Sequence, residues 1–333
     1  MTEKKSKPLL RWGIIGCGDV TEVKSGPAYQ KTAGFELKAV MRRNQEKVKD
    51  YAQRHGIEKY FTDADALIND PDIDAVYIAT PPDSHLFYAL KVAAAGKTCC
   101  IEKPMAPSYE ESKQILEVFE EKNIPLFVAY YRRSMPRFTK VKEWLNQGEI
   151  GTVRHINWQL SQPPNALDLS GDYNWRTDPI VAAGGYFDDL ASHGLDLFVY
   201  FLGEIQEASG VSLNQQGLYG AKDAIAATWL HRGGITGAGV WNFGMASMDR
   251  VEIFGNQGKI SFSVFEEMPL ILEKEGKKTA LFIEHPQHVQ MPHVENMKKH
   301  LLEGGYSHPS TGNSGAHTSW VMDQILGRKI SNH

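Results

Sequence analysis

A short segment, GGYFDDLASHGLD at residues 184–196, carries acid and base side chains at a spacing that can support proton transfer. Asp189, His193 and Asp196 stand at i, i+4 and i+7, so on a helix they share one face. A histidine beside a carboxylate can accept a proton from an alcohol during oxidation and return it during carbonyl reduction. The alternative is a helix N-terminus that favours Asp188 and Asp189 through its dipole, with His193 packed in an interface. Spacing alone leaves both interpretations open.

A lysine occupies a second position of chemical interest, at the end of the apolar run in KTCCIEKPM, residues 97–105. This run predicts a buried strand that closes with Glu102 and Lys103. A lysine near a substrate hydroxyl can hydrogen-bond the oxygen and favour its developing negative charge, especially where burial lowers the lysine pKa. The alternative is a surface lysine just before the turn at Pro104.

The stretch LLRWGIIGCGDVT, residues 9–21, predicts the element around which these side chains are organised. An apolar run of strand length leads into closely spaced glycines and then into a helix-compatible segment. Gly16 can form the tight turn and Gly18 lets the backbone approach a pyrophosphate at a helix N-terminus, although Thr21 replaces the third glycine of the fingerprint. An ordinary strand-to-helix turn is the alternative. The candidate dinucleotide contacts in this turn are Gly16, Cys17, Gly18, Asp19 and Val20.

The strand predicted next, FELKAVM at residues 35–41, is followed directly by two arginines. An acid at this place would hold the ribose 2′-hydroxyl of NAD, but the chain has Arg42 and Arg43, and the nearest acid is Glu46 in the following helix. Guanidinium groups match a 2′-phosphate in charge and fork geometry, which favours NADP over NAD. A solvated basic turn is the alternative.

A further strand, predicted over residues 75–79, ends in the turn TPPDSH, residues 80–85. Ligands of doubly wound sheets bind at such carboxyl ends of strands, so Thr80 and Pro81 are candidate cofactor contacts. His85 begins the next helix, where a histidine serves as a packing or capping residue more often than as a ligand contact. It is retained as a candidate.

The remaining pattern predicts the architecture. The first helix should run from the glycine turn to about residue 33, and another helix should cover residues 132–147. Alternating runs after residue 152 indicate an antiparallel sheet with an open face that suits a subunit interface, and Trp320, Val321 and Ile325 should pack a final helix. The predicted fold is α/β, with an N-terminal Rossmann dinucleotide-binding domain (9–130) followed by an α+β domain with a large, mostly antiparallel open sheet (131–333).

Composition narrows the classes of partner. The chain has 333 residues and a net charge of -4, which offers no basic surface for nucleic acid. No stretch is apolar enough for a membrane span or signal peptide, and residues 1–8 are expected to form a loose tail. The cysteines are odd in number and suit a reducing cytoplasm, with Cys99 and Cys100 packed as small apolar groups. The histidines of the C-terminal part lack a compact ligand set, so no metal is expected.

Taken together, four stretches resemble the Gfo/Idh/MocA oxidoreductases, a family named for glucose-fructose oxidoreductase and inositol dehydrogenase. They are GIIGCGDV (13–20), ATPPDSH (79–85), EKP (102–104) and GGYFDDLASHGLD (184–196), and their order and spacing agree with the family. The resemblance implies that Lys103 orients the reacting oxygen, that His193 is the general acid/base, and that Asp189 holds the substrate or the histidine. It also implies that Trp175 and Arg176 lie near the nicotinamide, and that the second sheet forms a homodimer or homotetramer.

The activity expected from these features is hydride transfer between a nicotinamide cofactor, NADP favoured and NAD possible, and a secondary alcohol or ketone of a sugar, polyol or related cyclic diol. Lys103, Asp189 and His193 are the expected catalytic residues, and Glu102 and Lys103 are further cofactor candidates. Trp158, Tyr173 and Trp175 are expected to line the substrate pocket. Two alternatives on the same fold are a non-catalytic dinucleotide-binding regulatory protein and an NAD-dependent glycosidase.

Overall fold

The computed structural model describes residues 9–328, so the tail expected over residues 1–8 lies outside the described residues. The described chain divides into two compact units. The first unit contains residues 9–106, 113–135 and 286–313, and the second contains residues 107–112, 136–285 and 314–328. Across residues 9–328, no helix has both the length and the apolar character needed to cross a membrane.

The first unit is built on a parallel sheet whose strand order is β3-β2-β1-β4-β5-β6. β1 lies between β2 and β4, and the order reverses there, which is the topological switch point where doubly wound folds bind ligands. The expected Rossmann sheet is confirmed. Its strands are β1 (Leu10–Ile15), β2 (Phe35–Met41), β3 (Lys59–Phe61), β4 (Ala75–Ile78), β5 (Thr98–Ile101) and β6 (Leu126–Val128).

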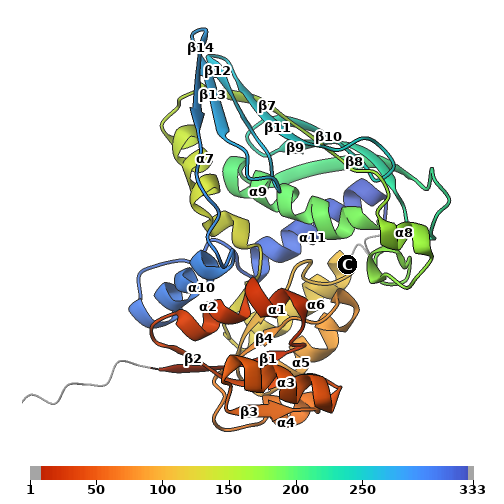
Figure 1. Cartoon of the computed structure of the whole chain (residues 1–333). Coiled ribbons are helices and arrows are strands. Elements are labelled where there is room, and N and C mark those ends of the chain that lie inside the picture. The colour runs from red at the N-terminus through yellow and green to blue at the C-terminus, as the bar shows by residue number, and fades with distance from the viewer. Residues whose placement is uncertain (1–8, 329–333) are drawn as a thin grey trace, which may run out of the picture. The chain divides into compact units, whose positions relative to one another are not determined.

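Helices follow most of these strands, and in Figure 1 α3 and α4 lie against the β2 and β3 side of the sheet. The α-helices associated with this unit are α1 (Asp19–Val23), α2 (Gly26–Lys31), α3 (Gln45–His55), α4 (Ala64–Ile68), α5 (His85–Ala94), α6 (Tyr109–Glu121) and α10 (Met291–Lys298). Short 3-10 turns, η1 (Pro82–Ser84) and η2 (Tyr131–Ser134), and a π-helical turn, η5 (Lys299–Glu303), complete it.

The helix expected from the glycine turn to residue 33 is wrong as a single element, because it breaks between α1 and α2. Gly26 sits where an added Cβ would lie 2.3 Å from the Thr21 carbonyl oxygen, and Pro27 follows at a first-turn position where its missing N–H costs little. The helix expected over residues 132–147 likewise begins later, as α7 (Pro136–Asn146), after the 3-10 turn η2.

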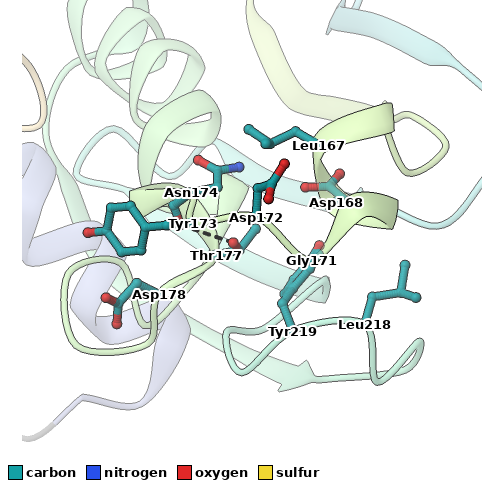
Figure 2. Close-up of a pocket in the computed structure, with 10 residues that line it drawn as sticks. All are labelled: Leu167, Asp168, Gly171, Asp172, Tyr173, Asn174, Thr177, Asp178, Leu218 and Tyr219. Carbon is teal, nitrogen blue, oxygen red and sulfur yellow. Dashed lines mark hydrogen bonds between the residues drawn. The ribbon is translucent and has the colours of Figure 1, made fainter.

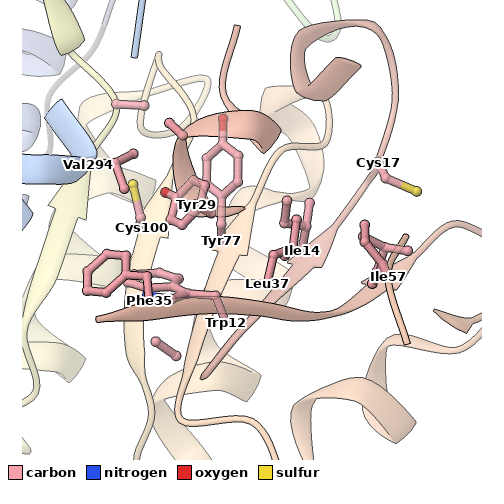
Figure 3. Packing of buried hydrophobic residues seen from close by; sticks show 14 of the residues in the cluster. Trp12, Ile14, Cys17, Tyr29, Phe35, Leu37, Ile57, Tyr77, Cys100 and Val294 are labelled. Carbon is pink, nitrogen blue, oxygen red and sulfur yellow. The ribbon is translucent and has the colours of Figure 1, made fainter. Parts of the chain in front are cut away.

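The core of the first unit includes residues from a distant part of the chain. Trp12 packs against Tyr29 and Phe35 with ring centroids 4.8 and 5.3 Å apart, and Val294 of α10 belongs to the same buried cluster (Figure 3). Segment 286–313 therefore completes this unit by burying apolar surface against it.

The second unit is built on a sheet of order β14-β13-β12-β11-β7-β10-β9-β8. It is antiparallel except for β7 and β10, which pair in parallel, so the expected mostly antiparallel sheet is confirmed with one parallel pair. Its strands are β7 (Val153–Ser161), β8 (Ile205–Leu213), β9 (Ala224–His231), β10 (Thr236–Asn242), β11 (Met248–Gly255), β12 (Gly258–Phe262), β13 (Leu270–Lys274) and β14 (Lys277–Leu281).

One face of this sheet carries α9 (Ser192–Leu202) and α11 (Gly312–Leu326), as Figure 1 shows. Trp158 of β7 meets Phe198 of α9 edge to face at 5.6 Å, and an added Cβ at Gly210 of β8 would lie 2.7 Å from the Ile325 carbonyl oxygen. The final helix is thus packed as its apolar spacing predicts. The short helix α8 (Ala166–Ser170) and the 3-10 turn η3 (Trp175–Thr177) lie in the connection after β7.

Candidate active site

In the glycine turn after β1, Gly16 is closely packed and Gly18 is open. Gly16 has a φ of +90°, and an added Cβ would lie 2.6 Å from Thr80 Cγ2 and 2.9 Å from the Thr80 amide nitrogen. Glycine is therefore required by both conformation and close packing against the end of β4. At Gly18 the nearest heavy atom to an added Cβ is 3.9 Å away, so the space over this residue is open. An open glycine beside a helix start fits the approach of a dinucleotide pyrophosphate.

Thr21, the departure from the glycine fingerprint, closes this turn with its side chain. Its hydroxyl donates to the Gly18 carbonyl at 2.8 Å and accepts from the Gly18 amide at 3.0 Å, and the side chain is fully buried. Tyr51 donates to the Thr21 carbonyl at 2.8 Å. The Thr21 hydroxyl thus stabilises the glycine turn through two hydrogen bonds, at the position where the fingerprint has its third glycine. The amides of Asp19 and Val20 follow in the first turn of α1, where a helix leaves N–H groups without acceptors in its own helix.

The arginines after β2 lie at the same edge of the sheet. Arg42 is half-buried and donates from Nη1 to the Cys17 carbonyl at 3.3 Å, which joins the end of β2 to the glycine turn, and Arg43 is exposed. The guanidinium retains further N–H donors for a phosphate, so the geometry fits a 2′-phosphorylated ribose. Burial raises the pKa of the Cys17 thiol to about 11, so this cysteine stays protonated at neutral pH.

The histidine of the turn after β4 is fully buried. His85 Nε2 lies 2.8 Å from the Thr80 carbonyl oxygen, and Nδ1 lies 3.1 and 3.2 Å from the carbonyl oxygens of Pro104 and Met105. Burial lowers the pKa of His85, although the carbonyl groups favour its charged form. The ring therefore lies between the carbonyl groups of the turn after β4 and those of the turn after β5, and in its neutral form it donates to a carbonyl of one of these turns. Pro81 beside it is exposed.

Glu102 and Lys103 follow β5 at the same edge. The Glu102 side chain is buried, and its carboxylate accepts a hydrogen bond from the Lys103 amide at 3.0 Å. It also accepts from Tyr77 at 2.5 Å and from Gln290 at 2.6 Å. Gln290 lies 188 residues from Glu102 in the chain and belongs to no recognisable motif, so the sequence does not identify it as a partner of Glu102.

In the second unit the segment 184–196 does not start as a regular α-helix. Phe187–Ala191 forms a π-helical turn (η4), and α9 begins at Ser192, so Asp189 lies in the π turn and His193 in the α-helix. The single α-helix assumed from the i, i+4, i+7 spacing is therefore wrong. π turns inside helices occur frequently at functional sites.

The three residues expected to share one helix face have different surroundings. Asp189 accepts from Arg176 Nε at 2.5 Å, and the Arg176 guanidinium lies 4.5 Å from the Trp175 ring centroid. Asp196 is fully buried and accepts from the Thr318 hydroxyl of α11 at 3.2 Å. His193, itself 5% exposed, meets the ring of Phe265 edge to face at 5.7 Å.

Asp188, which the alternative interpretation assigned to a helix dipole, has a cationic partner. Its carboxylate accepts from Arg328 Nη2 at 2.5 Å and from the Gly184 amide at 2.9 Å, while Arg328 also contacts Asp323 at 3.0 Å. Burial raises the pKa of Asp188, and Arg328 opposes this effect. These contacts attach the chain just after α11 to the π turn that contains Asp188. Only the tertiary structure reveals this cluster of charged residues.

The prediction that Trp158 lines the substrate pocket is wrong. Trp158 is fully buried, donates to Asp249 at 3.0 Å and covers Gly194 of α9. Tyr173 is 75% exposed and lines a surface hollow of about 290 Å³ with Asn174 and Asp178 (Figure 2). This volume is at the lower end for a small-molecule site. Trp175 is half-buried and is not among the residues that line this hollow.

Comparisons with known proteins agree with this architecture. Residues 10–130 match the oxidoreductase family with an NAD-binding Rossmann fold, GFO/IDH/MocA, and residues 138–261 match the C-terminal domain of the same family. Oxidoreductase P35 of Formosa agariphila is 39% identical over 96% of this chain and 98% of its own length. Levoglucosan dehydrogenase of Pseudarthrobacter phenanthrenivorans is 32% identical over 58% of this chain and 46% of its own length.

A solved structure shares the fold across both units. Levoglucosan dehydrogenase in complex with NADH and levoglucosan has a TM-score of 0.81 and 24% identity, covering 96% of each chain. The resemblance stated from the motifs is confirmed by these matches, which span the glycine turn, the EKP turn and the segment that carries His193. The chain belongs to the GFO/IDH/MocA family of oxidoreductases.

Proposed function

We propose that this protein transfers a hydride between NADP(H) and a secondary alcohol or ketone of a sugar, polyol or related cyclic diol. The observation that carries the proposal is the buried Asp189 carboxylate, held by Arg176 at 2.5 Å and placed four residues before His193. Family membership supplies the nicotinamide chemistry, because the matched N-terminal family is NAD-binding. The levoglucosan dehydrogenases among the similar proteins support a carbohydrate substrate.

The proposed roles divide between a lysine that orients and a histidine that moves the proton. Lys103 donates a hydrogen bond to the reacting oxygen and favours its negative charge. His193 accepts the hydroxyl proton during oxidation and returns it during reduction, while Asp189 holds the substrate or the histidine in position. A nicotinamide cofactor, when bound, would supply the acceptor or donor of the hydride.

The proposed dinucleotide contacts are the glycine turn, residues 16–20, with Thr80, Pro81, Glu102, Lys103, Trp175 and Arg176. His85 is proposed as a positioning residue that joins the two turns, in place of the direct contact expected from sequence. NADP is proposed over NAD because Arg42 reaches the glycine turn and no acid follows β2 before Glu46. NAD remains the alternative, since the similar levoglucosan dehydrogenase structure holds NADH.

We assign dinucleotide binding to residues 9–130, and substrate binding and assembly to residues 131–333. Segment 286–313, which packs with the first unit, is the exception to a simple division at residue 130. The open face of the β7–β14 sheet is the proposed homo-oligomer surface. Val211, Val240 and Met248 are exposed apolar residues on its strands.

The decisive test is a fluorescence titration of the full chain with NADPH and, separately, NADH, followed by a panel of sugars, inositols and cyclic diols. NADPH binding at least tenfold tighter than NADH binding, with turnover on a panel member, is the expected result. Tight binding without turnover on any member would favour the regulatory protein. Release of an aglycone from a glycoside without net change in nicotinamide would instead favour the glycosidase.

A further inference from the structure

The carboxylate of Glu102 is held by hydrogen bonds from three separate parts of the first unit. Tyr77 of β4 and the side-chain amide of Gln290 donate to Oε1 at 2.5 and 2.6 Å, and the Lys103 amide donates to Oε2 at 3.0 Å. Tyr77 is fully buried and stacks on Tyr29 with ring centroids 5.0 Å apart. Figure 3 labels both side chains in the buried cluster. One oxygen of the carboxylate is therefore fixed by the protein interior, and the other is fixed to the lysine that follows.

Gln290 reaches this carboxylate because its own backbone is anchored. It is 1% exposed and occupies the N-cap of α10, where its amide donates to the Lys24 carbonyl at 3.2 Å. Two residues earlier, His288 Nδ1 lies 2.7 Å from the Val23 carbonyl oxygen. The chain before α10 is thus fastened to the end of α1, and the Gln290 side chain enters the unit from a fixed base.

The orientation of the Gln290 amide follows from its partner. A carboxylate oxygen only accepts hydrogen bonds, so the group 2.6 Å from it is the NH₂. The Gln290 Oε1 atom is buried and has no hydrogen-bond partner among the described residues. Leaving a buried acceptor unsatisfied is unfavourable, so packing alone does not account for a glutamine at this position. The hydrogen bond that its NH₂ group donates to Glu102 does account for it.

We propose that Gln290 is a positioning residue for Lys103, acting through the Glu102 carboxylate. With Tyr77 it fixes Glu102, and Glu102 fixes the backbone N–H of Lys103 and so the direction in which the lysine leaves β5. Neither matched family region, 10–130 or 138–261, includes residue 290. The expected effect of Gln290 on turnover rests on the proposed function, whereas its expected effect on the orientation of Lys103 does not.

Two substitutions separate a donor role from simple filling of space. Gln290→Met keeps the length of the side chain and removes the N–H. Gln290→Glu places a second carboxylate against Glu102, and two carboxylates at this distance bind one proton between them. At low pH that proton restores a donor, and at high pH it is lost. Gln287→Met and Gln287→Glu are matched controls, because Gln287 is exposed on the same segment.

The first measurement follows Lys103 without using activity. Reductive methylation with formaldehyde and cyanoborohydride, mapped by mass spectrometry on the full chain, gives the rate at Lys103 relative to the exposed Lys47. We expect the relative rate to change in Gln290→Met, and to change in Gln290→Glu at pH 8.5 while matching wild type at pH 5.5. The Gln287 variants should match wild type throughout. Equal Lys103 rates in all variants would overturn the proposal.

The second measurement uses steady-state kinetics on whichever panel member the wild type turns over. Gln290→Met should lower kcat by about 10²-fold, the effect of a displacement of about 1 Å at a reacting group, with NADPH affinity within a few fold of wild type. Gln290→Glu should approach wild-type kcat at pH 5.5 and lose it at pH 8.5. An unchanged kcat in Gln290→Met would contradict the proposal. If Gln290→Met fails to fold, the pH dependence of Gln290→Glu decides. A ratio of its kcat to wild-type kcat that stays constant between pH 5.5 and pH 8.5 would contradict the donor role.

Failure of the proposed function gives a different pattern. A wild-type chain without turnover on any panel member would remove the hydride-transfer assignment. The methylation rates would still report whether Gln290 positions Lys103.

Discussion

The Nε atom of Arg176 lies 2.5 Å from Oδ2 of Asp189, which joins the 3-10 turn η3 to the π turn that precedes α9. The Asp189 side chain is 9% exposed and that of Arg176 is 39% exposed. The pair therefore holds a buried carboxylate with a cation that still reaches solvent. This contact fixes the orientation of the Asp189 carboxylate, which stands four residues before His193 in the chain.

The first prediction concerns this pair. Asp189→Asn keeps the shape and removes the charge, and we expect kcat to fall by about 10²- to 10³-fold, within the range for positioned acid–base groups. Arg176→Met should cause a smaller loss, and the double variant should resemble Asp189→Asn because the two residues act together. Steady-state kinetics on all three variants and on the exposed control Asp172→Asn would measure this. Fully additive losses would show that the contact has no functional coupling.

Lys103→Ala tests the orienting lysine. Turnover should become undetectable, because the developing charge on the reacting oxygen loses its donor, while NADPH affinity stays within a few fold of wild type. Turnover assays and fluorescence titration of the same preparation separate these effects, with the exposed Lys122→Ala as control. Preserved turnover would remove Lys103 from the mechanism.

Arg42→Asp tests the choice of cofactor. The substitution replaces a guanidinium at the end of β2 with a carboxylate that repels a 2′-phosphate and accepts from a 2′-hydroxyl, so preference should shift from NADPH to NADH. The ratio of the two dissociation constants, compared with that of Lys47→Asp on the exposed part of α3, measures the shift. NADPH affinity equal to that of wild type would show that Arg42 does not meet the phosphate.

Two buried histidines of the first unit should make stability depend on acid. Burial lowers the pKa of His293 well below its usual range and lowers that of His308 to about 4. Below about pH 6.5 the two histidines take up protons in the unfolded chain but stay neutral in the folded chain. Their contribution to the free energy of unfolding is therefore complete above pH 6.5 and is lost as the pH falls toward 4. Each group should steepen the fall by up to about 1.4 kcal/mol per pH unit in that window.

Urea unfolding at pH 7, 6 and 5 would measure this fall in wild type and in His293→Leu, which removes one of the groups. The variant should show a shallower loss between pH 6.5 and 5 than wild type, whatever its stability at pH 7. Parallel curves would contradict the assignment to His293.

Gly194, the residue after His193, should not tolerate a side chain. An added Cβ would lie 2.3 Å from Cζ3 of Trp158, which is fully buried between β7 and α9. Gly194→Ala should therefore lower the free energy of unfolding by about 1–3 kcal/mol, as overpacked cores do, despite the higher helix propensity of alanine. Thermal or urea unfolding would show this. A variant as stable as wild type would mean that Trp158 can move aside.

Local patterns identified the elements of the first unit with few errors. An apolar run before a glycine turn and a strand followed by Arg42 are recognised from neighbouring residues, and the sheet places them as the pattern predicts. The break between α1 and α2 was missed because it depends on packing of Gly26 against Thr21, which helical periodicity does not report. Similarly, the π turn at Asp189 was missed because the spacing of acid and base residues along the chain also fits a continuous α-helix.

By itself, the sequence determined the fold class, the family, the glycine turn and the residue types at Lys103, Asp189 and His193. These features are local or are carried by motif order, and both survive without knowledge of distant contacts. Only the tertiary structure assigned Arg176 to Asp189, Arg328 to Asp188 and Gln290 to Glu102, and moved Trp158 from a pocket wall into the core. Such partners are chosen by the burial of charge and apolar surface across long chain separations, and no periodicity in the sequence records which distant residue will meet a given carboxylate.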